Sequence, residues 1–270
     1  MTNLYAQFTA SIPQNYDRYL GMVLFDPFAR DLARRVPKES RRILETACGS
    51  GIVTRRLLQA LPREASLVAT DLNAPMVEHA RAAVGADSRL TWRTADMCDL
   101  GLPKGSFDTV VCQFGVMFVP DKVTALREAL RVLTPGGLYL FNVWDALAEN
   151  RFASLANEVI TGFFPEDPPG FYQVPFSMHD ANAVRALLAQ AGFEDARSTR
   201  LDLETTAPSA DDFAKGLVEG NPVVAEIQAR GGASIEDVRS RLAGRLRAEL
   251  GDRPVSTRLR AFVCEARAPK

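Results

Sequence analysis

A short run of small residues between an apolar strand and a helix is the feature that most limits the fold of this chain. Residues 43–46 (Ile-Leu-Glu-Thr) are strand-like, and residues 47–51 (Ala-Cys-Gly-Ser-Gly) follow directly. Helical spacing of apolar residues begins immediately after Gly51. Small residues at such a turn let the backbone approach a ligand closely, and the N–H groups that open the next helix point toward it.

A second apolar run ends in Asp71, 20 residues after Gly51. A carboxylate in this place can accept hydrogen bonds from the two hydroxyls of a ribose. A plain strand-to-helix turn would account for the glycines alone, and an acid that complements a helix dipole would account for Asp71 alone. Together the two features predict a site for a nucleoside-containing cofactor.

Strand and helix patterns alternate through the first half of the chain. Strands are expected at residues 41–46, 66–71, 90–94, 107–113 and 138–143, with helical patterns between most of them. This order predicts a parallel sheet with helices on both faces. Ligands of such sheets bind beyond the carboxyl ends of the strands. Glu45, Asp71, Asp96 and Gln113 stand at four such ends, so we expect their side chains along one rim.

The chain divides into four expected parts. Residues 1–40 read as an N-terminal helical segment or lid, bent near Pro27, and residues 41–145 as the cofactor-binding core. Residues 146–178 hold several aromatic residues and four prolines, which predicts a long loop that is either a substrate wall or part of the core. Residues 179–270 are expected to complete the sheet, with a helical insertion at 208–253.

Composition excludes several classes of protein. The net charge of −1 disfavours binding to nucleic acid, whose partners are usually basic. Four isolated cysteines and two histidines predict no metal site and a reducing compartment. The N-terminus lacks the pattern of a signal peptide, and no apolar run approaches the length of a membrane span. We therefore expect a soluble cytoplasmic protein that binds no membrane.

Five segments of the first half resemble, in order and spacing, the class I S-adenosylmethionine-dependent methyltransferases, of the small-molecule type that includes quinone-biosynthesis enzymes. The matching segments are residues 44–51, 71–72, 95–97, 107–111 and 133–137. The resemblance implies a Rossmann-like, doubly wound, seven-stranded and mostly parallel sheet with an antiparallel terminal strand. Ala47 stands where the family has the first glycine of its triplet, and alanine is a mild replacement provided that its φ is negative.

The resemblance also implies S-adenosyl-L-methionine as the cofactor and a set of residues that bind it. Gly49 and Gly51 would pass close to its methionine part, and Asp71 would hold the ribose hydroxyls. Asp96 would accept from the adenine amino group. The full set implied is Tyr16, Glu45, Ala47, Gly49, Gly51, Asp71, Leu72, Met76, Asp96, Met97, Gln113 and Phe114.

Within that set, Leu72 and Met76 would flank the adenine, with Met97 stacking nearby. Gln113 and Phe114 would lie near the transferable methyl, and Tyr16 would close over the cofactor. The tyrosine is explained equally well by packing of the N-terminal helix, and Asp96 by a solvated loop.

The sequence predicts no catalytic base. His179 is a candidate, but a cap-adjacent surface histidine explains it slightly better, and His79 is expected to face solvent. We expect a methyltransferase that acts on a small, apolar or aromatic acceptor, and a homodimer is left open. An NAD(P)-dependent oxidoreductase and a non-catalytic cofactor-binding module are the alternatives. The first would need a glycine at position 54, where the chain has Thr54.

Overall fold

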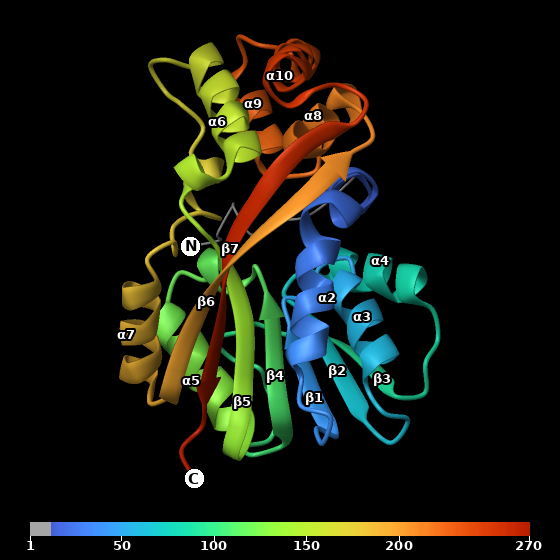
Figure 1. Ribbon diagram of the computed structural model, residues 1–270, viewed down its shortest axis with the longest axis vertical. Helices are drawn as coiled ribbons and strands as arrows, with labels where there is room; N and C mark the ends of the chain where they lie inside the picture. The colour runs from blue at the N-terminus through green and yellow to red at the C-terminus, as the bar shows by residue number, and fades with distance from the viewer. Residues whose placement is uncertain (1–11) are drawn as a thin grey trace.

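The computed structural model describes residues 12–270 and contains one seven-stranded sheet in the order β3-β2-β1-β4-β5-β7-β6 (Figure 1). Strand β7 runs antiparallel to both β5 and β6, and the pairs among β1 to β5 are parallel. The predicted fold, including the antiparallel last strand, is confirmed. The strands are β1 (Arg42–Thr46), β2 (Ser66–Asp71), β3 (Leu90–Thr94), β4 (Phe107–Gln113), β5 (Leu133–Trp144), β6 (Glu194–Ala207) and β7 (Val255–Arg267).

Helices cover the sheet because its central strands are apolar on both sides. Val110, Val111 and Leu140 are fully buried, as expected of a parallel strand covered on two faces. One helix group packs α2 on α3, and the other packs α5 on α7 (Figure 1). The helices of these groups are α2 (Asp26–Arg35), α3 (Ile52–Ala60), α4 (Ala74–Val84), α5 (Lys122–Val132) and α7 (Ala181–Ala191).

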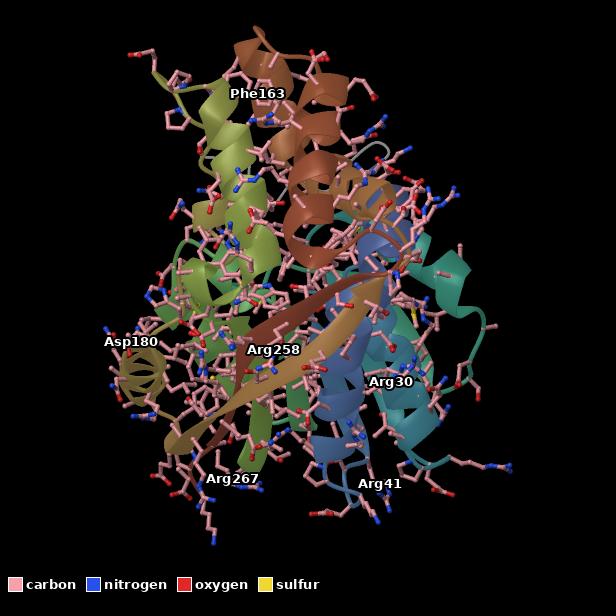
Figure 2. The ribbon with its side chains drawn as sticks, turned by 45° about the horizontal axis from the view of Figure 1, so that its top comes forward. Arg30, Arg41, Phe163, Asp180, Arg258 and Arg267 are labelled. Carbon is pink, nitrogen blue, oxygen red and sulfur yellow. The ribbon has the colours of Figure 1, made fainter. Side chains whose placement is uncertain are left out.

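Further helices form a layer beyond the carboxyl ends of the parallel strands (Figure 1). They are α6 (Arg151–Phe163), α8 (Ala210–Glu219), α9 (Val223–Arg230) and α10 (Ile235–Leu250). The long antiparallel pair of β6 and β7 rises from the sheet into this layer. In Figure 2, Arg258 lies near the start of β7, and Arg267 marks its end at the foot of the sheet. This layer of α6, α8, α9 and α10, called the roof below, thus covers the edge of the sheet where ligands of such sheets bind.

Two of these helices are absent from the expectations drawn from the sequence. The stretch 146–178 was expected to be a loop, yet it contains α6, which buries Phe152, Leu155 and Val159 at helical spacing. All four prolines that suggested a loop come after this helix ends at Phe163. Helix α9, only eight residues long, was also missed.

The N-terminal segment is helical, as expected, and its geometry changes next to Pro27, where a break or bend was predicted. Helix α1 (Ile12–Asn15) leads into a π-helix, η2 (Tyr16–Phe25), and α2 begins at Asp26. Pro27 lies in the first turn of α2 and has no N–H to donate to the helical turn before it. The change from π to α geometry thus falls between Phe25 and Asp26, directly before Pro27.

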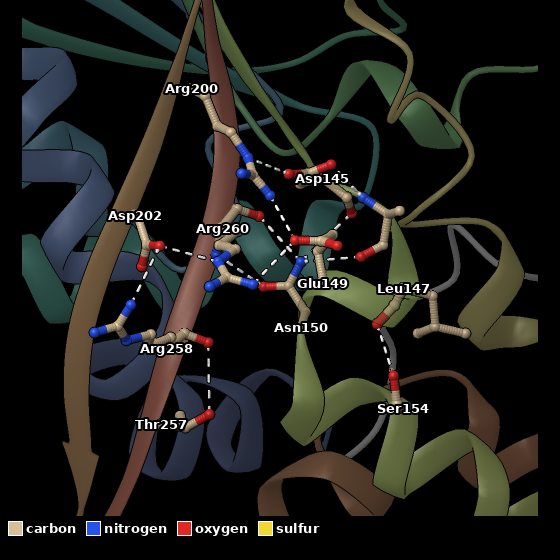
Figure 3. Close-up of polar contacts among 11 residues, drawn as sticks. Asp145, Leu147, Glu149, Asn150, Ser154, Arg200, Asp202, Thr257, Arg258 and Arg260 are labelled. Carbon is tan, nitrogen blue, oxygen red and sulfur yellow. Dashed lines mark hydrogen bonds and ion pairs between the residues drawn. The ribbon is translucent and has the colours of Figure 1, made fainter.

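A buried polar junction joins the sheet to the roof (Figure 3). The amide of Asn150, fully buried, receives a bond from the Arg260 N–H at 2.9 Å and donates to the Arg260 carbonyl at 3.0 Å. Around it, Arg200 bonds Asp145 and Glu149 at 2.6 Å each, and Arg260 bonds Glu149 at 2.9 Å. The structure also has three short 3-10 turns, η3 (Val116–Phe118), η4 (Leu147–Glu149) and η5 (Phe171–Gln173), and η4 contributes Glu149 to this junction.

The arginines of α10 form ion pairs at the surface. Arg239 pairs with Glu219 and Glu236, and Arg245 pairs with Glu158 and Glu249. They belong to a solvated helix face, where ion pairs add little stability. None of the helices within residues 12–270 is long and apolar enough to span a membrane.

Candidate functional site

The carboxyl ends of the first four strands border a cavity of about 360 Å³. Ten of the twelve residues predicted to bind cofactor line it, and Glu45 and Gly51 do not. The ten are Tyr16, Ala47, Gly49, Asp71, Leu72, Met76, Asp96, Met97, Gln113 and Phe114. The structure therefore brings together residues from five separate parts of the chain, and their roles toward a ligand remain predictions.

The loop after β1 has left-handed backbone at three positions. Ala47 has φ +51°, Gly49 φ +54° and Gly51 φ +80°. The negative φ on which the mild replacement at Ala47 depended is therefore wrong, and this residue holds a strained conformation in the cavity wall. Gly51 acts in packing instead: a Cβ there would lie 2.8 Å from Val84 Cγ2 on α4. The absence of a side chain at Gly51 therefore lets α4 pack closely against the loop, and Gly51 does not line the cavity.

Asp71, at the end of β2, is fixed by three hydrogen bonds and is 7% exposed. Its carboxylate accepts from the Gly49 N–H at 2.9 Å, and from the N–H and the side-chain amide of Asn73 at 2.9 and 3.2 Å. Burial raises the pKa of Asp71, and these donors partly offset that effect. Asn73 precedes α4 but makes no side-chain cap bond, because its amide is turned back to Asp71.

Glu45 was predicted to bind cofactor, but it does not line the cavity. Its carboxylate is 1% exposed and accepts a 2.6 Å hydrogen bond from the Thr54 hydroxyl on α3. Burial is the main cause that raises the pKa of Glu45 to about 8. The side chain thus joins β1 to α3 beneath the glycine loop rather than lining the cavity.

The β2 and β3 side of the cavity is a slot between apolar side chains. Leu72 is 53% exposed at its rim, while Met76 and Met97 are buried in its wall. Asp96 lies at the slot and accepts from the Cys98 N–H at 2.8 Å. A flat ring that carries an amino group would cover Leu72 and could donate to Asp96.

The β4 end of the cavity carries an unpaired buried oxygen. Gln113 donates its amide nitrogen to the Phe25 carbonyl at 3.2 Å, and its Oε1 has no hydrogen-bond partner within the described chain. Phe114 follows with φ +50°, and its N–H donates to the Asn142 side chain at 3.0 Å. A buried carbonyl oxygen without a donor suits a ligand that brings a cation or an N–H.

A second, apolar cavity of about 60 Å³ adjoins the first. Tyr16, Phe114 and Phe118 line both cavities, so the two spaces share a wall. The other lining residues are Leu20, Leu24, Phe25, Trp144, Phe152, Phe171, Tyr172, Pro175, Phe176, Leu217 and Asn221. Four of these residues were not predicted from the sequence: Phe118, Trp144, Leu217 and Asn221. No local sequence pattern shows that the distant segments to which they belong meet at this cavity.

Both interpretations of the aromatic stretch 146–178 describe part of it. Phe152, Phe171, Tyr172 and Phe176 are buried and also line the second cavity. Phe163, at the end of α6, and Phe164 do not line it. Figure 2 places Phe163 high in the helical layer, away from the sheet.

Neither histidine lines either cavity. His179 is exposed, and its Nδ1 lies 2.9 Å from the Phe176 carbonyl, one residue before the cap of α7. His79 is half-buried rather than facing solvent, and its Nε2 lies 3.5 Å from an oxygen of Asp17. No cluster of three His, Cys, Asp or Glu that could hold a metal ion occurs in residues 12–270.

Comparison with known proteins finds similarity to methyltransferases. A family model described as "Methyltransferase domain" matches residues 43–137. The ubiquinone/menaquinone biosynthesis C-methyltransferase of Ectopseudomonas mendocina is 30% identical over 173 residues, which are 58% of this chain and 66% of that protein. A solved structure described as a type II methyltransferase, from Anaeromyxobacter dehalogenans, superposes with a TM-score of 0.64 at 21% identity and covers 92% of this chain and 97% of that one.

The chain contains a methyltransferase domain at residues 43–137. The predicted family and fold are therefore confirmed, and an oxidoreductase is not favoured. In this domain, Thr54 occupies the place where a dinucleotide fingerprint needs a glycine, and its hydroxyl is bonded to Glu45. The matched region spans slightly less than two thirds of the curated relatives, 62 to 66% of their length.

Proposed function

We propose that this methyltransferase binds S-adenosyl-L-methionine in the larger cavity and transfers its methyl group to a small apolar or aromatic molecule in the second. The observation that carries the proposal is the wall formed by Tyr16, Phe114 and Phe118, which both cavities share. A methyl group at the point where the two cavities meet would lie next to an acceptor in the second cavity.

The side chains of the larger cavity suit each part of this cofactor. Asp71, held by three donors, has acceptor capacity left for ribose hydroxyls. Leu72 and Met97 suit the two faces of an adenine, with Asp96 for its amino group. The unpaired Oε1 of Gln113 suits the charged methionine end.

The chemistry requires little from the protein beyond placement. S-adenosylmethionine, when bound, supplies a methyl group already activated on a sulfonium sulfur. The residues of the shared wall would hold acceptor and methyl in line and exclude water, which accounts for most of the rate in such displacements. The faces of Tyr16 and Phe114 would also favour a cation beside them.

The second cavity offers aromatic surface and few polar groups. Burial raises the pKa of both Tyr16 and Tyr172, so both hydroxyls stay protonated at neutral pH. The Tyr172 hydroxyl is already committed to the Leu217 carbonyl at 2.8 Å. These features support an acceptor with a mainly apolar body.

Methyl transfer is tested with radiolabelled S-adenosylmethionine and a panel of apolar phenols, amines and thiols, by extraction of labelled product. The proposal predicts transfer to members of the panel, and no transfer to hydrophilic counterparts of the same nucleophiles. Binding of S-adenosylhomocysteine with no transfer to any member would favour the non-catalytic cofactor-binding module. Stabilisation by NAD or NADP, with none by S-adenosylhomocysteine, would favour the oxidoreductase.

A further inference from the structure

Asp17, in the first turn of the π-helix η2, contacts the loop that borders the larger cavity. Its Oδ1 accepts a hydrogen bond from the Ser50 hydroxyl at 3.0 Å, and Arg55 Nη2 lies 3.7 Å from the same oxygen. Ser50 belongs to the glycine loop and is buried. One carboxylate therefore bridges the N-terminal segment to the glycine loop and to α3.

The other oxygen of Asp17 faces α4. His79 Nε2 lies 3.5 Å from Oδ2, and this buried nitrogen has no closer hydrogen-bond partner among residues 12–270. Gly21, one turn further along η2, allows the close approach, because a Cβ there would lie 3.1 Å from Ile52 on α3. Asp17 thus contacts the glycine loop, α3 and α4, and the first and last of these contribute residues to the wall of the larger cavity.

The residue before Asp17 is Tyr16, which lines both cavities. Neighbouring residues of a helix point in different directions, so Asp17 faces the glycine loop while Tyr16 faces the cavities and stacks on Phe25 at 4.6 Å. The far end of η2 is held separately: Thr205 on β6 donates to the Val23 carbonyl at 2.8 Å, and Gln113 donates to that of Phe25.

Helix α8 holds η2 from the roof side. A Cβ on Gly216 would lie 2.6 Å from Leu20, and one on Gly220 would lie 3.2 Å from the Tyr16 backbone. The two helices therefore pack at backbone distance. On the side of the glycine loop, the contact of η2 is polar and centres on Asp17.

We propose that Asp17 is a positioning residue, which clasps η2 to the glycine loop and α4 and so holds Tyr16 between cofactor and acceptor. The inference rests on the proposed function, because it concerns how the cofactor is retained. Loss of the clasp would let η2 lift at the Tyr16 end while its other anchors remain. Cofactor would then leave faster, and the aromatic wall would become more accessible.

The test compares Asp17→Ala and Asp17→Asn with a matched control, Asp31→Asn. Asp31 is also an ion-paired carboxylate of the N-terminal helices, but it bonds Arg35 and borders neither cavity. S-adenosylhomocysteine is the probe, because it lacks the sulfonium charge, so the lost carboxylate charge affects its affinity less than that of S-adenosylmethionine. Its affinity is measured by calorimetry and its dissociation rate by stopped flow.

A second readout reports the position of η2. The chain has two tryptophans, and Trp144 contacts Phe25 at 6.4 Å between ring centroids. In a Trp92→Phe background, quenching of Trp144 by acrylamide reports how open the aromatic wall is. A residue with a purely structural role would change the melting temperature without a specific change in this quenching.

Asp17→Ala should weaken binding about ten-fold through faster dissociation, and should increase quenching of Trp144. Asp17→Asn, which can still accept from Ser50, should fall between Asp17→Ala and Asp31→Asn, and it also covers the case in which the alanine variant does not fold. Affinity, dissociation rate and quenching equal to those of Asp31→Asn would overturn the proposal. Failure of the unsubstituted chain to bind the probe would instead overturn the proposed function.

Discussion

The ring of Phe114 lies flat against that of Trp144, with centroids 4.0 Å apart and planes within 4°. Phe114 follows β4 and lines both cavities, whereas Trp144 ends β5 and lines the second cavity alone. Phe28 of α2 meets both rings edge-on, at 5.2 and 5.4 Å. This stack forms the floor on which the proposed acceptor would rest, and its rigidity follows from packing on three elements.

Filling the second cavity should stop transfer without affecting the cofactor. In Leu217→Phe, the larger ring enters a space of about 60 Å³ and displaces the acceptor. Turnover should fall at least about ten-fold, while affinity for S-adenosylhomocysteine stays within two-fold of the unsubstituted chain, and overpacking should cost about 1–3 kcal/mol of stability. Turnover is followed by release of S-adenosylhomocysteine with an acceptor from the panel.

Leu217→Met is the matched control, because it conserves volume. It should keep most of the turnover. Equal activity in Leu217→Phe and Leu217→Met would remove the second cavity from the reaction.

Glu45 should make stability depend on pH. Its folded pKa is about 8, against 4.5 for an ordinary glutamate, so the unfolded chain ionises first as the pH rises. The stability that Glu45 contributes is therefore complete below pH 4.5 and is lost as the pH rises through 8, by a total on the order of 5 kcal/mol.

Glu45→Gln removes this titration and retains an oxygen that can accept from Thr54. Urea unfolding of both proteins from pH 5 to 9 should show the native chain losing stability relative to the variant up to about pH 8. A difference between the two that does not vary with pH would mean that Glu45 is ionised within the fold.

The junction in Figure 3 should depend on Asn150 more than on its surface ion pairs. Asn150→Ala leaves the Arg260 N–H without its buried acceptor, which should cost about 2–4 kcal/mol of unfolding free energy. Arg258→Ala removes only exposed pairs with Asp202 and Glu204, which should cost less than about 1 kcal/mol. Chemical denaturation measures both, and equal losses would contradict this account of the junction.

Local patterns in the sequence were sufficient to predict the parallel strands and most of the residues that line the larger cavity. An apolar run that ends on Asp71 or Gln113 predicts where a strand stops, and parallel pairing then places these ends at one edge. The bounds of β2, β3 and β4 agree with the predicted ranges for this reason.

The errors arose where contacts distant in sequence decide the outcome. The direction of the Glu45 side chain depends on its hydrogen bond to Thr54. Ala47, whose φ is left-handed, packs its methyl group closely against Gly115. Trp144 and Leu217 meet across a cavity although they lie 73 positions apart. No periodicity within one segment contains such information.

The proposed function requires that strand ends of one sheet jointly bind the adenosine of S-adenosylmethionine, and calorimetric titration with S-adenosylhomocysteine measures this binding. One molecule should bind per chain, and Asp71→Ala should weaken the affinity by about 1–3 kcal/mol, because the substitution removes the acceptor of the ribose hydroxyls. No binding by the unsubstituted chain, or the same affinity in Asp71→Ala, would contradict it.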